Sequence, residues 1–411
     1  MIDLRRSRAY VAVAVCGGTA FVDMYATQPL LPDFLTAFHA SHAHVAQTVS
    51  ALTLAVAFTA PFVGPAADAI GRKSVIVGSI LALAAATFAA SFAGGLGELI
   101  FWRVVQGVAM PGVFATTLAY VAEEFEPAVA GRAVGAYIGG NVFGGFLGRF
   151  VSAAVAARSD WHVAFVALGA LNLAGAACVV ALLPPARNFR RRKSLRGALA
   201  AMRRFVTDPT LLATYAVGGC ALFALVAAFT FATFRFAAVP FSLSTDLLGD
   251  IFAVYLAGVV AAPLSGRLID RFGNKATVLL GLGIGAGGML LTLPVYLPTA
   301  IAGLGCMSTG VFITQASSQG AVGRIAGSDR STAASLYLSV YYGGASLGAV
   351  APAYTWTHGG WPPTVALVVG VLALAAVLAA TWRDLGPVAA RVATEPRARA
   401  LEAGTTAGSA R

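Results

Sequence analysis

Two copies of one loop, 202 positions apart, constrain the fold of this 411-residue chain more than any other feature. The first copy reads GPAADAIGRK over residues 64–73, and the second reads GRLIDRFGNK over residues 266–275. Each copy joins two long apolar segments, and the matched pairs are Gly64/Gly266, Asp68/Asp270, Gly71/Gly273 and Lys73/Lys275. A repeat of this length in apolar sequence is typical of a secondary transporter built from two related halves.

The composition places the chain in a membrane rather than in water. Hydrophobic residues make up 58% of the sequence and charged residues 11%, whereas an ordinary globular domain carries roughly a quarter charged residues. The excess of 28 Lys and Arg over 17 Asp and Glu could suggest a nucleic-acid partner. These charges fall in short clusters between apolar stretches, so we exclude nucleic acid and expect a lipid bilayer.

Twelve apolar segments, each about 20 residues long, can cross the hydrocarbon core of a bilayer as helices. Their continuous apolar character excludes the alternating pattern of membrane β-strands. We therefore predict an all-α membrane protein with twelve transmembrane helices. The predicted spans are 10–31, 46–67, 74–93, 98–121, 131–155, 162–183, 211–235, 249–268, 276–296, 299–321, 331–353 and 362–382.

The positive charges determine the predicted orientation. With the N-terminus inside, all but four of the 28 Lys and Arg residues fall on the cytoplasmic side, where basic residues are retained. We therefore expect both termini to be cytoplasmic and the chain to cross the inner (plasma) membrane many times. The four exceptions are Arg103, Arg149, Arg158 and Arg235.

The repeat divides the chain into two bundles of six helices. The predicted parts are an N-terminal bundle over 1–184, a basic cytoplasmic linker over 185–210, a C-terminal bundle over 211–383 and a disordered cytoplasmic tail over 384–411. Prolines bound the linker, and the tail has no apolar period. A second repeat supports this division, with the pairs Tyr137/Tyr337, Gly144/Gly344 and Gly148/Gly348.

These features together resemble the major facilitator superfamily over residues 1–383. Further motifs are similar to its drug:proton antiporter branch, and the stretches 120–124, 139–141 and 335–337 are most similar to the YnfM-like, arabinose-efflux-permease-type subgroup. The motif residues are Asp23-Met24-Tyr25 with Pro29 and Pro32, Leu99 with Arg103, Gln106 and Gly107, and Gly135 with Gly144 and Gly148. Arg149 departs from the pattern by replacing a proline, and Ala69 by replacing a basic residue.

The resemblance implies a transporter that works by alternating access around a cavity between the bundles. We expect proton-coupled efflux (antiport) of small amphipathic molecules. The alternatives are an uncoupled facilitator, a proton-coupled importer of a sugar or small metabolite, and a non-transporting membrane receptor. Because the sequence has no phosphate-binding glycine loop and no hydrolase constellation, we expect no enzyme activity and no cofactor, with the proton gradient as the energy source. We expect a monomer without bound metal.

Asp23 is the predicted proton carrier. An ionisable group inside a span is costly and usually functional, and burial favours the neutral form of a carboxyl group. We predict an Asp23–Arg103 pair with Gln106 as a hydrogen-bonding neighbour. Alternatively, Asp23 caps its helix end and Arg103 extends to the lipid headgroups. We expect Arg149 and Arg235, near outer helix ends, to extend to the headgroups as well.

The two repeated loops are predicted to hold the inside closed while the outside is open. Charged groups at helix ends can pair across the two bundles, and Glu123 and Glu124 are expected partners of Arg72. The alternative is a solvated loop whose charges only set the orientation. The predicted gating residues are Gly64, Asp68, Gly71, Arg72, Lys73, Glu123, Glu124, Gly266, Asp270, Arg271, Gly273 and Lys275.

Two further sets of residues complete the predicted site. An apolar, aromatic cavity suits lipophilic molecules that are neutral or weakly charged. Its predicted lining residues are Tyr25, Gln106, Tyr215, Phe223, Tyr337 and Tyr341. Close helix packing through small residues is predicted along the motif that contains Gly135, Gly144, Gly148 and Arg149.

Overall fold

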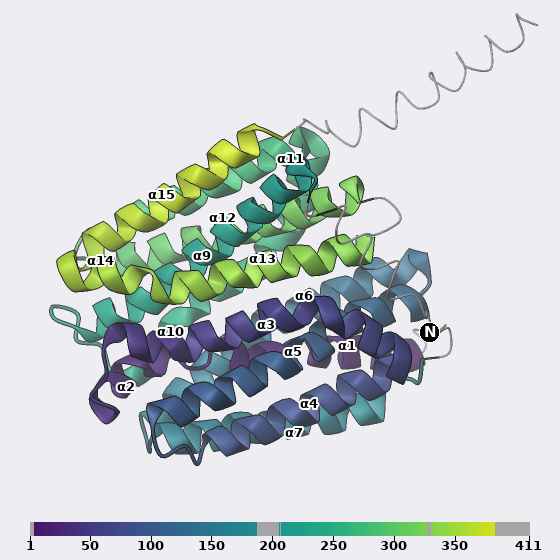
Figure 1. Cartoon of the computed structure of the whole chain (residues 1–411), viewed down its shortest axis with the longest axis horizontal. Helices are drawn as coiled ribbons and strands as arrows, with labels where there is room; N and C mark the ends of the chain where they lie inside the picture. The colour runs from purple at the N-terminus through teal and green to yellow at the C-terminus, as the bar shows by residue number, and fades with distance from the viewer. Residues whose placement is uncertain (1–3, 187–204, 206, 327–329, 383–411) are drawn as a thin grey trace, which may run out of the picture.

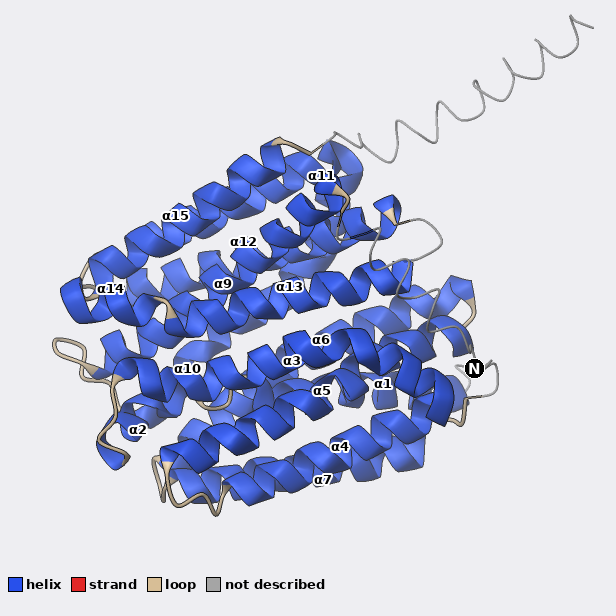
Figure 2. Ribbon diagram, viewed as in Figure 1, coloured by secondary structure: helices blue, strands red, loops and turns tan. Residues whose placement is uncertain are grey.

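The structure is a computed structural model that describes residues 4–186, 205, 207–326 and 330–382 (Figure 1). Within these ranges the chain forms helices joined by short connections, and no strand is present (Figure 2). This architecture confirms the predicted all-α membrane fold. Most of the predicted linker 185–210 and the whole predicted tail 384–411 lie outside the described residues.

The long helices form two halves, which lie one above the other in Figure 1. The N-terminal half contains α1 (Leu4–Met24), η1 (Gln28–Leu30), α2 (Leu31–Ala37), α3 (His42–Ile70), α4 (Arg72–Ala90), α5 (Leu96–Glu124), α6 (Pro127–Ala156) and α7 (Trp161–Leu182). The C-terminal half contains α9 (Pro209–Ala237), α10 (Thr245–Ile251), η2 (Phe252–Leu256), α11 (Ala257–Leu291), α12 (Leu297–Ile325), α13 (Arg330–Val350), α14 (Pro352–Gly359) and α15 (Trp361–Ala380).

Ten helices in the described part of the chain are long and apolar enough to cross a membrane. Two of the twelve predicted spans differ from this set. Residues 249–268 divide among α10, η2 and the beginning of α11, which is itself kinked at Gly273. Residues 331–353 form most of α13, whose serine, tyrosine and glycine residues lower its hydropathy. α13 nevertheless packs along α3 and α9, which both belong to the apolar set.

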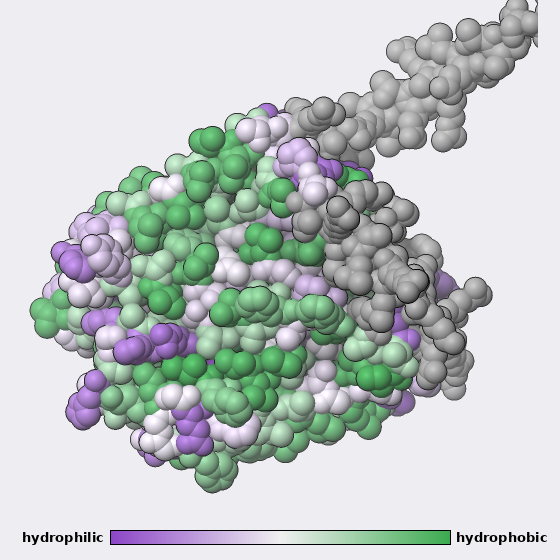
Figure 3. All heavy atoms as spheres, in the orientation of Figure 1, coloured by the Kyte–Doolittle hydropathy of each residue, from purple (hydrophilic) through white to green (hydrophobic). Residues whose placement is uncertain are grey.

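Hydrophobic side chains cover much of the outer surface of the long helices (Figure 3). Phe62 on α3 and Val377 on α15 are exposed by 70% and 64%. Hydrophilic side chains gather at the end of the molecule where α2 and α10 lie. An extensive apolar exterior is stable in contact with lipid and marks a membrane surface.

The second sequence repeat corresponds to two equivalent helix contacts. α6 lies so close to α1 that a Cβ atom at Gly144 or Gly148 would collide with the α1 backbone, and α13 lies against α9 in the same way. The contacting pairs are Gly144 with Gly18, Gly148 with Val22, Gly344 with Gly219 and Gly348 with Phe223. Gly135 takes no part in this packing because a Cβ there would meet no atom within 4 Å, so the prediction is wrong at that position.

The two halves contact each other at the end of the molecule where α2 and α10 lie, which we name the α2/α10 end. There the hydroxyl of Thr245 donates a hydrogen bond to the Asp33 carboxylate at 3.0 Å, and the His42 ring packs on Phe234 at 4.8 Å. At the opposite end, where α1 begins (Figure 1), the first glycine of each repeated loop has open space around it. The protein is therefore closed at the α2/α10 end.

Candidate functional site

The candidate site surrounds the point where α1 ends. α1 ends at Met24, and Pro29 and Pro32 follow in η1 and α2. Proline has no backbone N–H and restricts the residue before it, so α1 does not continue as one helix through this segment. The break leaves carbonyl oxygens of the last turn of α1 without partners inside the helix, and they point into the protein interior.

Asp23 lies in this last turn and is completely buried. Its Oδ2 accepts hydrogen bonds from the Thr87 hydroxyl of α4 at 3.1 Å and from the Asn172 amide of α7. Its Oδ1 has no hydrogen-bond partner in the described part of the chain. Sequence reasoning missed Thr87 and Asn172. The only signal for them is that they are polar residues within apolar helices, and this does not show which residue they contact.

Arg103 is also completely buried, on α5. Its guanidinium donates to the main-chain oxygens of Asp23 at 2.8 Å and Met24 at 2.9 Å, and to that of Thr48 on α3 at 2.8 Å. The predicted pair with the Asp23 carboxylate is therefore not formed in this structure. The physical reason is the break in α1, since the free carbonyl oxygens at a helix C-terminus carry partial negative charge.

We name Asp23, Thr87, Asn172, Arg103 and Gln106 the Asp23 cluster. Gln106 hydrogen-bonds Arg103, as predicted, and connects it to Thr87. Its Oε1 accepts from Arg103 at 2.6 Å, and its Nε2 donates to the Thr87 hydroxyl oxygen at 2.8 Å. The Thr87 hydroxyl also lies 2.8 Å from the main-chain oxygen of Leu83. Because Thr87 has one hydroxyl hydrogen, it can donate either to Leu83 or to Asp23, but not to both at full strength.

Arg149 does not extend to the lipid headgroups, and that prediction is wrong, because the side chain is only 2% exposed. Its guanidinium lies over the rings of Tyr25, Phe252 and Tyr255 at 4.8, 4.9 and 4.7 Å. Its Nε donates to Gln28 Oε1 at 2.8 Å. The aromatic residues of η2 shield Arg149 from lipid, and their proximity to α6 could not be deduced from the local sequence.

Arg235 is buried as well, contrary to the same prediction. Its guanidinium donates to the main-chain oxygen of Thr292 and, at 3.0 Å, to that of Pro294. These residues follow the last residue of α11, so Arg235 compensates a helix C-terminus in the same manner as Arg103. The rings of Phe241 and Trp361 lie 5.4 and 5.1 Å from its guanidinium carbon.

A tyrosine cluster lies between the two halves. Its members are buried tyrosines whose hydroxyl groups lie near one another, and they are Tyr25, Tyr137, Tyr255, Tyr337, Tyr341 and Tyr342. The rings of Tyr337 and Tyr341 stack at 5.5 Å, and Tyr342 meets Phe114 of the other half at 5.8 Å. The cluster contains three of the predicted cavity residues and connects to Arg149 through Tyr25 and Tyr255.

The other predicted cavity residues lie outside this cluster. Tyr215 contacts the edge of the cluster, with its ring 6.3 Å from that of Tyr337. Gln106 belongs to the Asp23 cluster, and the main chain of Phe223 packs against Gly348. The lining of a transport cavity by all six residues therefore stays a prediction.

The repeated loops have equivalent backbones. Gly71 and Gly273 both have positive φ angles, of 111° and 81°, a region that glycine adopts without steric cost. Lys73 donates to the main-chain oxygens of Val180 and Leu183, where α7 ends, and Lys275 donates to those of Ala380 and Trp382, where α15 ends. Each lysine thus stabilises a helix C-terminus within its own half.

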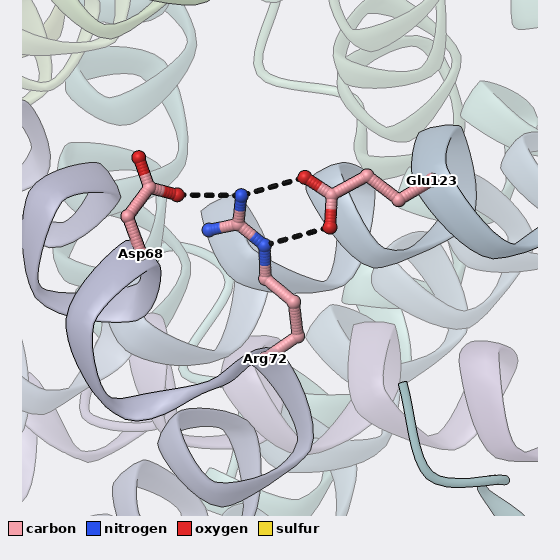
Figure 4. A network of polar contacts seen from close by, with 3 residues as sticks. All are labelled: Asp68, Arg72 and Glu123. Carbon is pink, nitrogen blue, oxygen red and sulfur yellow. Dashed lines mark hydrogen bonds and ion pairs between the residues drawn. The ribbon is translucent and has the colours of Figure 1, made fainter. Parts of the chain in front are cut away.

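The charged residues of the first loop pair within the N-terminal half (Figure 4). Arg72 lies 2.6 Å from the Asp68 carboxylate and 2.7 Å from that of Glu123, the residue before Glu124 at the end of α5. The expected contact of Arg72 with Glu123 is therefore present. The pairing across the two bundles is predicted for the state in which the inside is closed, and it stays a prediction. In the second loop Arg271 lies over the ring of its neighbour Phe272, 5.1 Å from the ring centre.

The second loop, in the C-terminal half, has a contact equivalent to that of Arg72 with Glu123, but with the arginine on the other side of the contact. Asn274 takes the place of Arg72, and Arg324 takes the place of Glu123, and the Arg324 guanidinium donates to the Asn274 amide oxygen. Of the remaining predicted loop residues, Gly64 and Gly266 have open space where a Cβ atom would lie, and the gating role of Asp270 stays a prediction. The two loops therefore share a backbone but differ in their ionic contacts.

Comparison with known proteins gives consistent relatives over almost the whole chain. YybF of Bacillus subtilis, described as an uncharacterized transporter of the major facilitator type, is 29% identical over 365 residues, which are 89% of this chain and 90% of that protein. The inner membrane transport protein YnfM of Escherichia coli is 29% identical over 372 residues, which are 90% of this chain and 88% of that protein. A chloramphenicol resistance protein of Streptomyces lividans is 29% identical over 312 residues and covers 72% of this chain and 76% of its own.

A solved structure has the same fold. It is that of a bacterial homologue of the human lysosomal transporter Spinster, in an inward-facing and occupied conformation. The TM-score is 0.75 at 15% sequence identity, over 92% of this chain and 97% of the other. The family model for the major facilitator superfamily matches residues 13–247 and 236–406. The two related halves, the membrane-spanning helices and these matches lead to one conclusion: the chain is a multi-pass membrane transporter, not an enzyme, and belongs to the major facilitator superfamily.

Proposed function

We propose that the protein is a proton-coupled antiporter that exports small amphipathic molecules by alternating access. The observation that carries this proposal is the environment of Asp23, a completely buried carboxyl group with one unpartnered oxygen. An ionisable residue in such a position inside a membrane is retained for a function. The name of the chloramphenicol resistance relative supports export of a small molecule.

The hydrogen bonds around Asp23 accommodate both the ionised and the protonated carboxyl group. When Asp23 is ionised, the Thr87 hydroxyl donates to Oδ2 at 3.1 Å. When Asp23 is protonated, it donates to the Thr87 oxygen, and the Thr87 hydrogen turns to the main-chain oxygen of Leu83 at 2.8 Å. The Asp23 Oδ2 atom and the Thr87 hydroxyl stay hydrogen-bonded to each other in both forms, so binding or release of the proton adds no further buried unsatisfied group.

The charge of Asp23 is linked to the arrangement of three helices. Arg103 holds the end of α1 to α5 and to the main chain of α3, and Gln106 and Thr87 connect this guanidinium to the Asp23 carboxylate. A change of charge on Asp23 alters the electrostatic attraction between the carboxylate and the guanidinium. We propose that this change shifts the position of the α1 end and favours opening at one side of the membrane.

The test is substrate-dependent proton movement by the purified protein in liposomes, followed with a pH-sensitive dye. Lipophilic cations, amphipathic carboxylates, chloramphenicol and sugars are added to the wild type, to Asp23→Asn and to the control Asp160→Asn. Asp160 is an exposed helix cap that asparagine replaces well. We expect a proton signal for an amphipathic compound in the wild type and the control, and none in Asp23→Asn.

Two other results would change the assignment. A full proton signal in Asp23→Asn would remove the coupling role of Asp23. Downhill flux of the compound without a proton signal in any of the three proteins would identify an uncoupled facilitator instead. We further propose a monomer in the inner membrane with both termini in the cytoplasm. The orientation is tested with a membrane-impermeant label on a cysteine placed at Thr245, which should react from outside.

A further inference from the structure

Four arginines of the described chain are buried, and three of them have an obvious source of negative charge. Arg72 lies between two carboxylates. Arg103 binds the carbonyl oxygens at the end of α1, and Arg235 binds those after the end of α11. Such compensation is required because an isolated ion is strongly disfavoured in an apolar interior.

Arg149 differs from the other three. Its hydrogen-bond partners are all neutral: the amide of Gln28 at 2.8 Å, the main-chain oxygen of Gly145 at 2.6 Å and the side chain of Tyr255. The Gly145 carbonyl lies inside α6 and belongs to no helix end. No carboxylate of the described residues forms an ion pair with Arg149. Aromatic faces attract the cation, but they do not neutralise its charge.

Arg149 lies where the two halves meet. Tyr25 and Gln28 belong to the N-terminal half, whereas Phe252 and Tyr255 belong to the C-terminal half. Gln28 also donates to the Thr230 hydroxyl of α9 at 3.0 Å. Movement of the halves apart at the α2/α10 end would therefore expose the guanidinium and remove part of its aromatic surroundings.

A second observation at this place points to a ligand. The hydroxyl of Tyr25 is buried and has no hydrogen-bond partner among the described residues, although its ring lies 4.8 Å from the Arg149 guanidinium. Buried hydroxyl groups are normally bonded, so an unpaired one beside an unneutralised cation requires an explanation. An oxyanion would accept hydrogen bonds from both groups and satisfy them together.

We propose that Arg149 binds the carboxylate of the transported molecule, and that the substrates are amphipathic organic anions with an aromatic or similarly flat apolar part. A guanidinium binds a carboxylate through two parallel hydrogen bonds, and the tyrosine cluster offers ring faces for the apolar part. This inference rests on the proposed transport function and specifies its substrate class. It replaces the expectation of neutral or weakly charged substrates.

The experiment compares matched probes on the purified protein in neutral detergent, where no anionic lipid competes. Benzoate, 2-naphthoate and 4-phenylbutyrate are titrated beside their uncharged amides by calorimetry. The proteins are the wild type, Arg149→Gln, Arg149→Lys and the control Arg158→Gln. Arg158 is exposed just beyond the same end of α6, so its replacement removes an equal charge from the same region.

We expect the wild type and Arg158→Gln to bind at least one carboxylate about tenfold more tightly than its amide, as for a charge-assisted hydrogen-bonded pair. Arg149→Gln should bind the amide as before and lose the preference for the carboxylate, and Arg149→Lys should retain part of it. Unchanged amide binding by Arg149→Gln shows that the variant is folded.

Three results would overturn the inference: no binding of any carboxylate probe, equal affinity for carboxylate and amide in the wild type, or a preference that survives in Arg149→Gln. The proton assay with Asp23→Asn separates this outcome from failure of the proposed function. Intact proton coupling together with no carboxylate preference in the wild type, or with a preference that survives in Arg149→Gln, rejects the role of Arg149 alone. A carboxylate preference without a proton signal rejects the coupling alone.

Discussion

Asp23 and Arg103 lie beside each other, yet the guanidinium contacts main-chain oxygens and not the carboxylate. The free carbonyl groups at the end of α1 provide a concentrated negative potential that is present whether or not Asp23 is ionised. Asp23 therefore keeps its own partners, Thr87 and Asn172. At the scale of single residues, this separation lets the carboxyl group change its protonation without releasing the arginine.

We predict that Thr87→Val lowers proton-coupled transport about tenfold or more, because a hydrogen bond to a charged group contributes roughly 1.5–3 kcal/mol. Valine keeps the shape of threonine but lacks the hydroxyl that bonds Asp23 and accepts from Gln106. The control Thr87→Ser restores the hydroxyl and should retain most of the activity. Initial rates of proton movement in liposomes measure the effect, and equal rates for valine and serine would contradict it.

Pairs of helices in each half are held together by glycines at equivalent positions. Gly148 brings α6 against the main chain of Val22 in α1, and Gly348 brings α13 against the main chain of Phe223 in α9. Close approach of backbones replaces the hydrophobic driving force that is absent between helices in lipid. At the scale of elements, the repeat in the sequence is a repeat of helix contacts.

We predict that Gly148→Ala and Gly348→Ala each destabilise the protein by about 1–3 kcal/mol, the usual cost of forcing a methyl group into a packed contact. Gly139→Ala and Gly343→Ala are matched controls on the same two helices, since a Cβ at either position meets no atom within 4 Å. Thermal unfolding midpoints in detergent should fall for the first pair and stay near the wild-type value for the second. Equal midpoints in all four variants would mean that the helices separate at little cost.

Several contacts between the halves lie at the α2/α10 end, where Thr245 binds Asp33 and Gln28 binds Thr230. If transport proceeds by alternating access, these contacts must break once in each cycle. At the scale of the whole molecule, the contacts at this end therefore control access to the tyrosine cluster and to Arg149.

We predict that an Asp33→Cys/Thr245→Cys pair forms a disulfide on oxidation and stops transport, and that a reductant restores it. The background variant lacks the native cysteines, which are Cys16, Cys178, Cys220 and Cys306. A Gly64→Cys/Gly266→Cys pair at the open positions of the two loops serves as the control and should not form a disulfide in the absence of substrate. Undiminished transport by the cross-linked protein would show that this end does not open.

The sequence by itself was sufficient for the class of fold, the two halves and the position of Asp23 within a span. Long apolar runs, basic clusters and a repeated loop are local signals, and the repeated glycines at 71 and 273 permit the positive φ angles that the backbone has there. The close contacts of Gly144 and Gly148 with α1 agree with the same kind of signal.

Only the tertiary structure decided which residues surround Asp23 and Arg149. Thr87 and Asn172 reach Asp23 from two other helices, and Tyr255 reaches Arg149 from the other half of the chain. These contacts join residues far apart in the sequence, and neither periodicity nor motif spacing predicts such long-range contacts. The burial of Arg149 follows from that long-range packing, because the same side chain near a helix end would otherwise have extended to the headgroups.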